Sequence, residues 1–206
     1  SMVTSLLLTD QFTLKDITMI ESELNLSKVK LSMSKDIYNE LIKGKMVNRY
    51  IYSSKEHSLI PDPHFIELRE NISEYSFQYK MIGHELVDKG EYFYLINRPA
   101  EKASTQDAKA KLHASLICIV RLITHEKGKL FEYLSNVNYG VATEDLNIDE
   151  LPDSYALIMQ RVKLKGFIDA LKLLSEKKLV LRTNRDKYIL SSSGLEIIES
   201  IIHKHI

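Results

Sequence analysis

Residues 61–96, PDPHFIELRENISEYSFQYKMIGHELVDKGEYFYLI, decide the fold of the first half of the chain. Pro63 marks a helix start, because proline is tolerated in the first helical turn. Apolar residues then recur at steps of three and four, which places them along one helix face. Gly83 ends the pattern, so the sequence predicts a helix over residues 63–82.

A β-hairpin is predicted directly after that helix. Two runs of strand type, residues 84–87 and 92–96, flank an Asp-Lys-Gly turn at 88–90. A shorter helix over residues 36–42 precedes, and residues 45–52 alternate loosely, as a strand does. Short helix, longer helix and hairpin in this order are typical of a winged helix-turn-helix unit.

The same order recurs in the second half. A helix is expected over residues 161–175, followed by two short strands, 179–182 and 187–190, and a last helix that begins near Ser193. The sequence therefore predicts an α+β, mainly helical fold of tandem winged-helix domains with β-hairpin wings. The expected domains are residues 1–100 and 101–206, joined by a linker within 97–106.

The long apolar helix expected at residues 107–124 has further consequences. A second helix is expected at 127–135, and a helical turn near 143–146. Residues 112–123 are apolar on nearly all sides, which predicts either a homodimer seam or packing between the two domains.

Composition limits the classes of protein to which the chain can belong. The chain has 206 residues, 44% of them hydrophobic, with 28 basic and 28 acidic side chains. Because Cys118 is the single cysteine, a disulfide within the chain is excluded, which fits a reducing compartment. We expect Cys118 to be a small residue of the core. We see no signal peptide and no apolar run long enough to span a bilayer. A soluble, cytoplasmic protein is expected, without membrane contact.

Sequence signatures of catalysis are missing. The seven glycines form no phosphate-binding loop of the Walker type, and neither a G-x-S-x-G elbow nor an H-E-x-x-H motif occurs. His203 and His205 lie two positions apart, which on a helix turns them to different sides. We therefore expect no enzyme, no metal site and no cofactor.

Positive charge concentrates in the second half. Residues 161–190 hold nine basic and three acidic side chains, a net charge of +6 in a chain of net charge zero. Such a stretch is either a solvated surface or a surface that follows DNA phosphates without reading bases. The residues expected to contact DNA are Arg161, Lys163, Lys165, Lys172, Arg182, Arg185 and Lys187.

Tyrosine is abundant, with eleven residues and no tryptophan. Four tyrosines cluster in the first unit: Tyr75, Tyr79, Tyr92 and Tyr94. They either fill its core with their hydroxyls at the rim or form a surface that binds a protein partner.

Several of these segments resemble the MukE family. They are the run from Tyr38 to Val47, the helix start Pro63-His64-Phe65-Ile66-Glu67-Leu68, and the strand Tyr92-Phe93-Tyr94-Leu95 after Glu85-Leu86 and Gly90. The long apolar helix and the basic helix and wing at 161–190 follow in the expected order. The similarity covers most of residues 36–203 and points to a divergent MksE-like relative.

The resemblance implies a non-catalytic condensin subunit with tandem winged-helix domains. Such subunits dimerise, bind the kleisin that bridges the SMC ATPase heads, and contact DNA non-specifically on the nucleoid. The family's DNA-contacting basic residues carry over best to Lys163 and Lys165, with Arg161 nearby. The chief alternative is a free-standing winged-helix transcriptional regulator. An enzyme with a concealed site is a third hypothesis.

Overall fold

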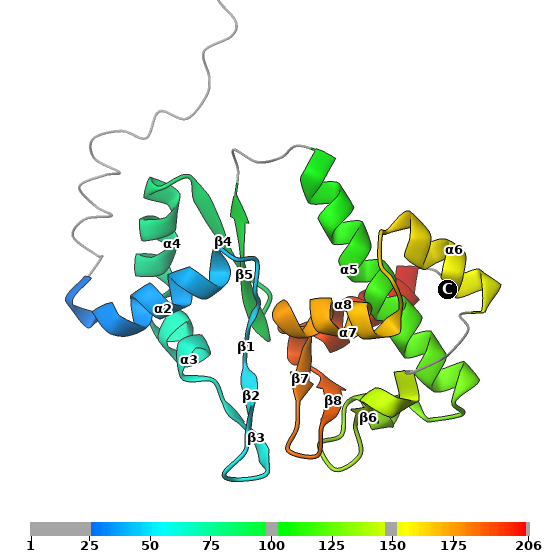
Figure 1. Ribbon diagram of the computed structural model, residues 1–206. Helices are drawn as coiled ribbons and strands as arrows, with labels where there is room; N and C mark the ends of the chain where they lie inside the picture. Colours follow the sequence, from blue (N-terminus) through cyan, green and yellow to red (C-terminus); the bar gives the residue numbers. More distant parts are fainter. Residues whose placement is uncertain (1–25, 98–102, 147–151, 205–206) are drawn as a thin grey trace, which may run out of the picture.

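The computed structural model describes residues 26–97, 103–146 and 152–204 (Figure 1). Helices predominate, and three small antiparallel sheets accompany them, which confirms the α+β class. The boundary expected between residues 100 and 101 lies outside the described residues. Within the described ranges, no helix is long and apolar enough to cross a membrane.

The first half contains helices and a three-stranded sheet around an aromatic core. Its elements are α2 (Leu31–Leu41), β1 (Val47–Asn48), α3 (Pro63–Glu70), α4 (Ile72–Met81), β4 (His84–Asp88) and β5 (Tyr92–Asn97). Strands β4 and β5 form the predicted hairpin, and β1 pairs with β5, so the sheet order is β1-β5-β4. Phe65 and Phe93 pack ring to ring in the core at a centroid distance of 5.1 Å.

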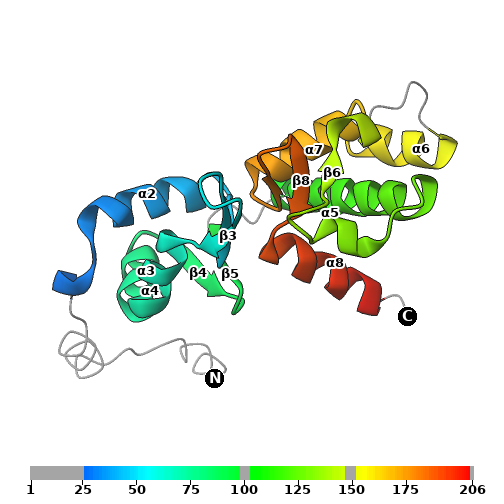
Figure 2. The same ribbon diagram turned by 90° about the horizontal axis from the view of Figure 1, so that it is seen from below.

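The second half repeats this order around its own core. Its elements are α5 (Ala103–Arg121), β6 (Val141–Ala142), α6 (Asp153–Arg161), α7 (Phe167–Glu176), β7 (Val180–Arg182), β8 (Lys187–Leu190) and α8 (Ser192–Lys204). Its sheet order, β6-β8-β7, again places the last strand in the middle. Helix α5 lies between α7 and α8 (Figure 2). Cys118 is buried here, as predicted, and burial raises the pKa of its thiol.

Three predicted helices differ from the observed ones. The helix expected over 63–82 divides at Asn71, whose side-chain amide donates to the Glu67 carbonyl while its backbone leaves the helical conformation. The segment 161–175 was expected to be one helix. It instead contains the last residue of α6, a turn in which the backbone of Lys163 is left-handed (φ 56°), and most of α7. At 127–135 a 3₁₀ turn over Phe131–Leu134 replaces the helix, because the left-handed Gly128 (φ 61°) interrupts it.

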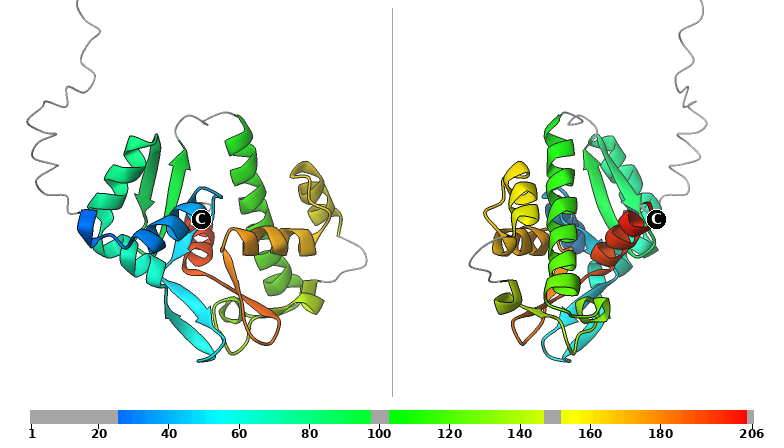
Figure 3. Two further views of the ribbon diagram at one scale, coloured as in Figure 1. Left: turned by 60° about the vertical axis from the view of Figure 1, so that its left-hand side comes forward. Right: turned by 90° about the vertical axis from the view of Figure 1, so that its right-hand side faces the viewer.

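A second hairpin in the first half was missed by sequence reasoning. Strands β2 (Tyr50–Ser53) and β3 (Ser58–Pro61) pair between β1 and α3 and form a separate sheet. The β2–β3 hairpin and the β7–β8 hairpin project from the same end of the molecule (Figure 3). The loose alternation at 45–52 thus belongs to two strands, β1 and β2.

The two halves meet through hydrogen bonds at the end of α7. Asn48, which is 1% exposed, donates from Nδ2 to the Lys178 carbonyl at 2.8 Å. Its Oδ1 accepts the backbone N–H of Ser193 at 2.9 Å. The N–H of Met46 also donates to the Lys177 carbonyl at 3.1 Å. One asparagine therefore joins three segments: β1, the α7–β7 turn and the start of α8.

An ion pair lies beside these hydrogen bonds. The ammonium of Lys178 contacts both carboxylate oxygens of Glu40, at 2.7 and 2.8 Å, and His64 Nδ1 lies 3.4 Å from the same carboxylate. Burial alone would raise the pKa of Glu40, but hydrogen bonding and charge attraction from Lys178, with a smaller contribution from His64, hold that pKa below its usual value. The charged carboxylate is therefore favoured by folding.

Replacing Glu40 with glutamine is expected to make stability less dependent on pH. Because folding lowers the pKa of Glu40, its contribution is present above the unfolded value of 4.5 and is lost as pH falls through the lower folded value. Glu40→Gln should therefore lower the free energy of unfolding by about 1 kcal/mol at pH 7, and by less near pH 3. Urea unfolding at the two pH values measures this difference.

The control is Glu91→Gln. Glu91 pairs with Arg49 at 2.8 Å, but both side chains are about half exposed, 47% and 48%. Glu91→Gln should change the free energy of unfolding only slightly at both pH values. An equal loss of stability at pH 3 and pH 7 in the Glu40 variant would contradict the assignment.

Candidate nucleic-acid interface

Helix α7 presents two of the predicted basic residues to solvent. Its buried face consists of Phe167, Ala170, Leu171 and Leu174. Lys172 is exposed on α7, and Lys165 is exposed just before the helix, where its N–H donates to Asp169 Oδ2 at 3.2 Å. The helical period places Lys172 away from the core, as the sequence predicts.

The β7–β8 hairpin carries the next group. Arg182 donates to Asp186 from Nε at 3.1 Å and from a terminal nitrogen, so an internal carboxylate already balances its charge. Arg185 is exposed in the turn, and Lys187 is half-buried on β8. Arg185 and Lys187 are therefore the cations of this hairpin that are available to an external anion.

The tip of this wing is tied to the β2–β3 hairpin. Asn184 donates from Nδ2 to the Ser54 carbonyl at 3.0 Å, and the same nitrogen lies 2.8 Å from His57 Nδ1. Lys55, exposed in the turn beside them, adds a positive charge that sequence reasoning did not include. No local pattern signals it, because the contact joins residues about 130 positions apart.

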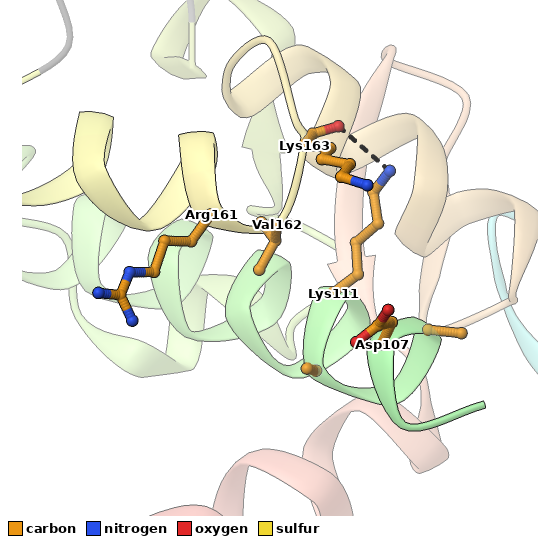
Figure 4. Close-up of a pocket in the computed structure, with 7 residues that line it drawn as sticks. Asp107, Lys111, Arg161, Val162 and Lys163 are labelled. Carbon is orange, nitrogen blue, oxygen red and sulfur yellow. Dashed lines mark hydrogen bonds between the residues drawn. The ribbon is translucent and has the colours of Figure 1, made fainter. Parts of the chain in front are cut away.

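Arg161 and Lys163 lie apart from the wing group. Arg161 ends α6 and Lys163 follows in the turn, and both line a pocket against the start of α5 (Figure 4). Lys111 of α5 lines the same pocket and donates to the Lys163 carbonyl at 3.3 Å. The expected position of Arg161 and Lys163 at the N-terminal end of the helix before the hairpin is therefore wrong, because that helix begins only at Phe167.

Two further lysines of the basic stretch use their ammonium groups in contacts with the first half of the protein. Lys178 pairs with Glu40, and Lys177 donates from Nζ to the Lys43 carbonyl. The net charge of +6 counted over residues 161–190 therefore overstates the positive charge that faces solvent.

The tyrosines of the first half belong mainly to its core. Tyr75, Tyr79 and Tyr92 are 0%, 2% and 5% exposed, whereas Tyr94 is half-buried. Burial raises the pKa of Tyr75 and of Tyr92 to about 12. Core filling therefore describes Tyr75 and Tyr79, whereas Tyr92 is buried outside that apolar cluster. In this conformation all three offer almost no surface to a partner.

The hydroxyls are not at the rim of that core. Tyr75 donates to Glu67 Oε1 at 3.4 Å, and Glu67 is itself only 2% exposed. Glu67 also accepts from the backbone N–H of Lys30 at 3.0 Å and from Asn71 Nδ2 at 3.3 Å. The hydroxyl of Tyr79 is buried without a hydrogen-bond partner among the described residues. A buried carboxylate, which the sequence pattern does not reveal, thus organises α2, α3 and α4.

The arrangement of exposed cations suits contacts to phosphate. The exposed cations on α7 and the wing are long, flexible side chains, which bind phosphate without sequence information. In the described part of the chain, no three His, Cys, Asp or Glu side chains come together in a way that could hold a metal ion.

The chain's relationship to known proteins agrees with this architecture. A family model described as condensin complex protein MksE matches residues 32–201. The match begins in α2 and ends in α8, so it spans both halves. A comparison with curated proteins gave no match. The resemblance seen in the sequence is thereby confirmed, and the chain belongs to the MksE family of condensin complex proteins.

Proposed function

We propose that this chain is a non-catalytic accessory subunit of an SMC/condensin-type complex that acts in chromosome organisation or segregation. It binds the kleisin subunit and, through the kleisin, an SMC ATPase. The observation that carries this proposal is the family match across both halves. The ATPase motifs that such a complex needs are absent from this sequence and are supplied by the SMC partner. The subunit acts in the cytoplasm, on the nucleoid.

Each half is a winged-helix unit in this proposal, with domains at 1–100 and 101–206. The order helix, strand, two helices and hairpin occurs twice. The sheet orders β1-β5-β4 and β6-β8-β7 correspond strand for strand. In such units the helix before the hairpin and the wing are the parts that approach DNA. The subunit works as a homodimer.

DNA binding is assigned to the second half. Lys165 and Lys172 beside and on α7, with Arg185 and Lys187 on the wing, face solvent together with Lys55 of the neighbouring hairpin. Contacts from these cations to phosphates would position DNA without reading its sequence.

The combined variant Lys172→Gln and Arg185→Gln is expected to weaken binding to a DNA duplex by at least about tenfold near 0.1 M salt. The dependence of log affinity on log salt should become shallower by about one unit for each lost phosphate contact. Fluorescence anisotropy at several salt concentrations measures both quantities. The control is Lys28→Gln with Lys35→Gln, which removes the same charge from the first half. Its DNA affinity and salt dependence should stay near the wild-type values. Equal weakening by both pairs would refute the assignment.

A pull-down from the native lysate, with and without nuclease, tests the function itself. We expect a kleisin and an SMC-type ATPase to be recovered in both arms and identified by mass spectrometry. Recovery only of DNA or polymerase-associated proteins would instead support the transcriptional regulator, which the family match does not favour.

A further inference from the structure

We infer that the pocket between α5 and the α6–α7 turn binds an acidic side chain of the partner subunit. This inference rests on the proposed function, which supplies the partner. The pocket has a volume of about 230 Å³. Three cationic side chains line it: Lys111 from α5, Arg161 from the end of α6, and Lys163 from the turn.

A hydrogen bond fixes the Lys111 ammonium in the pocket. Lys111 Nζ donates to the Lys163 carbonyl at 3.3 Å, which leaves the other hydrogens of that ammonium free to bind an anion. In Figure 4 the Lys111 and Lys163 side chains lie on one side of the pocket, and Arg161 lies on the other side of Val162. The backbone of Lys163 is left-handed (φ 56°), which turns the chain sharply between α6 and α7.

The charge of the pocket is not balanced internally. Among the described residues that line it, Asp107 is the one acidic side chain. Among the described residues, none of the four charged side chains of the lining forms an ion pair, whereas cations elsewhere do, such as Lys178 with Glu40 and Arg182 with Asp186. Lys111 and Lys163 lie on the same side of the pocket, so a bound carboxylate would be attracted to both ammonium groups, with Arg161 adding positive charge to the lining.

The lining fits a protein side chain better than a DNA backbone. Ala108, Ala110 and Val162 supply apolar surface, which suits the methylene groups of a glutamate more than a hydrated phosphodiester. Asp107 can accept a hydrogen bond from a backbone N–H of a protein partner, a donor that a phosphodiester lacks. A concave site of side-chain size also suits one anchoring residue, as protein interfaces use. The exposed cations on α7 and the wing remain the surface for DNA.

The test compares variants in their affinity for two ligands, the kleisin recovered in the pull-down and a DNA duplex. Lys111→Met with Arg161→Gln removes two charges and keeps an unbranched aliphatic stem at both positions. Ala108→Leu fills the pocket without changing charge, and leucine is a good helix former. Lys172→Gln is the control, because it removes a charge from the same half outside the pocket. Calorimetry or interferometry gives the dissociation constants, and circular dichroism verifies that each variant folds.

We expect both pocket variants to lose at least tenfold in affinity for the kleisin and to bind DNA as the wild type does. Lys172→Gln should show the opposite pattern. Unchanged kleisin affinity in folded pocket variants overturns the inference while the proposed function stands. Loss of DNA affinity alone overturns it in favour of a phosphate site. A wild-type protein that binds no kleisin overturns the proposed function and, with it, this inference.

Discussion

Replacing Asn48 with leucine is expected to lower the free energy of unfolding by about 2–4 kcal/mol, because it removes two hydrogen bonds and leaves the buried Ser193 N–H without a partner. The Lys178 carbonyl loses the donor at 2.8 Å, and the Ser193 N–H loses the acceptor at 2.9 Å. Leucine has the same branching and the same number of side-chain heavy atoms as asparagine but can replace neither bond. Each unsatisfied buried group costs about 1–3 kcal/mol.

Urea unfolding measures that loss, and hydrogen exchange locates it. The amide hydrogen of Ser193 should exchange faster in Asn48→Leu, because its acceptor is gone. Faster exchange there identifies loosening where the two halves meet rather than a general loss of stability.

Asn184→Leu is the matched control. Asn184 also joins the halves, through the Ser54 carbonyl at 3.0 Å, but it is exposed. Water replaces the lost bond there, so the effect should stay within about 0.5 kcal/mol. Equal effects of the two substitutions would show that the bonds of Asn48 do not hold the halves together.

Gly194→Ala is expected to destabilise the protein by about 1–3 kcal/mol, although alanine is the better helix former. Gly194 lies in the first turn of α8, and a Cβ there would lie only 2.2 Å from the carbonyl oxygen of Leu179. That atom belongs to the backbone and accepts the N–H of Ser191 at 3.0 Å, so it cannot move aside without breaking another contact. Helix α8 would have to shift away from the start of β7.

The expected loss of stability is opposite in sign to the usual effect of a glycine-to-alanine substitution in a helix. In an unobstructed helix the same substitution would stabilise by up to about 1 kcal/mol. Thermal or urea unfolding distinguishes the two outcomes. Ser192→Ala, two positions earlier in the same helix, should stay within about 0.5 kcal/mol of the wild type. A Gly194→Ala protein as stable as the wild type would mean that α8 does not approach Leu179 so closely.

Local chemistry made much of the fold predictable. The hairpin at residues 84–97 and the one at 180–190 were predicted, because strand-type runs around a turn are sequence-local signals. The turn at Thr143–Leu146 was also predicted. The break at Asn71 was missed, because the apolar period runs through it and the competing hydrogen bond to Glu67 depends on how that side chain is buried.

The sequence predicted how many basic residues the stretch 161–190 contains, but not where their side chains lie in the structure. The count over residues 161–190 treats nine cations alike. The structure divides them among α7, the wing, the pocket beside Lys111 and the contact with Glu40. That division depends on partners from the first half and from α5, which no window of the sequence contains.

By itself, the sequence determined the α+β class, the repeated helix-and-hairpin order, the buried Cys118 and the family, because periodicity, turn residues and motif order are properties of neighbouring positions. Only the tertiary structure decided which charges remain free, that three tyrosines are buried, and that Asn48 joins the two halves. Asn48 and Lys178 lie 130 positions apart, and their bond exists only because packing of two separate cores brings β1 against the end of α7.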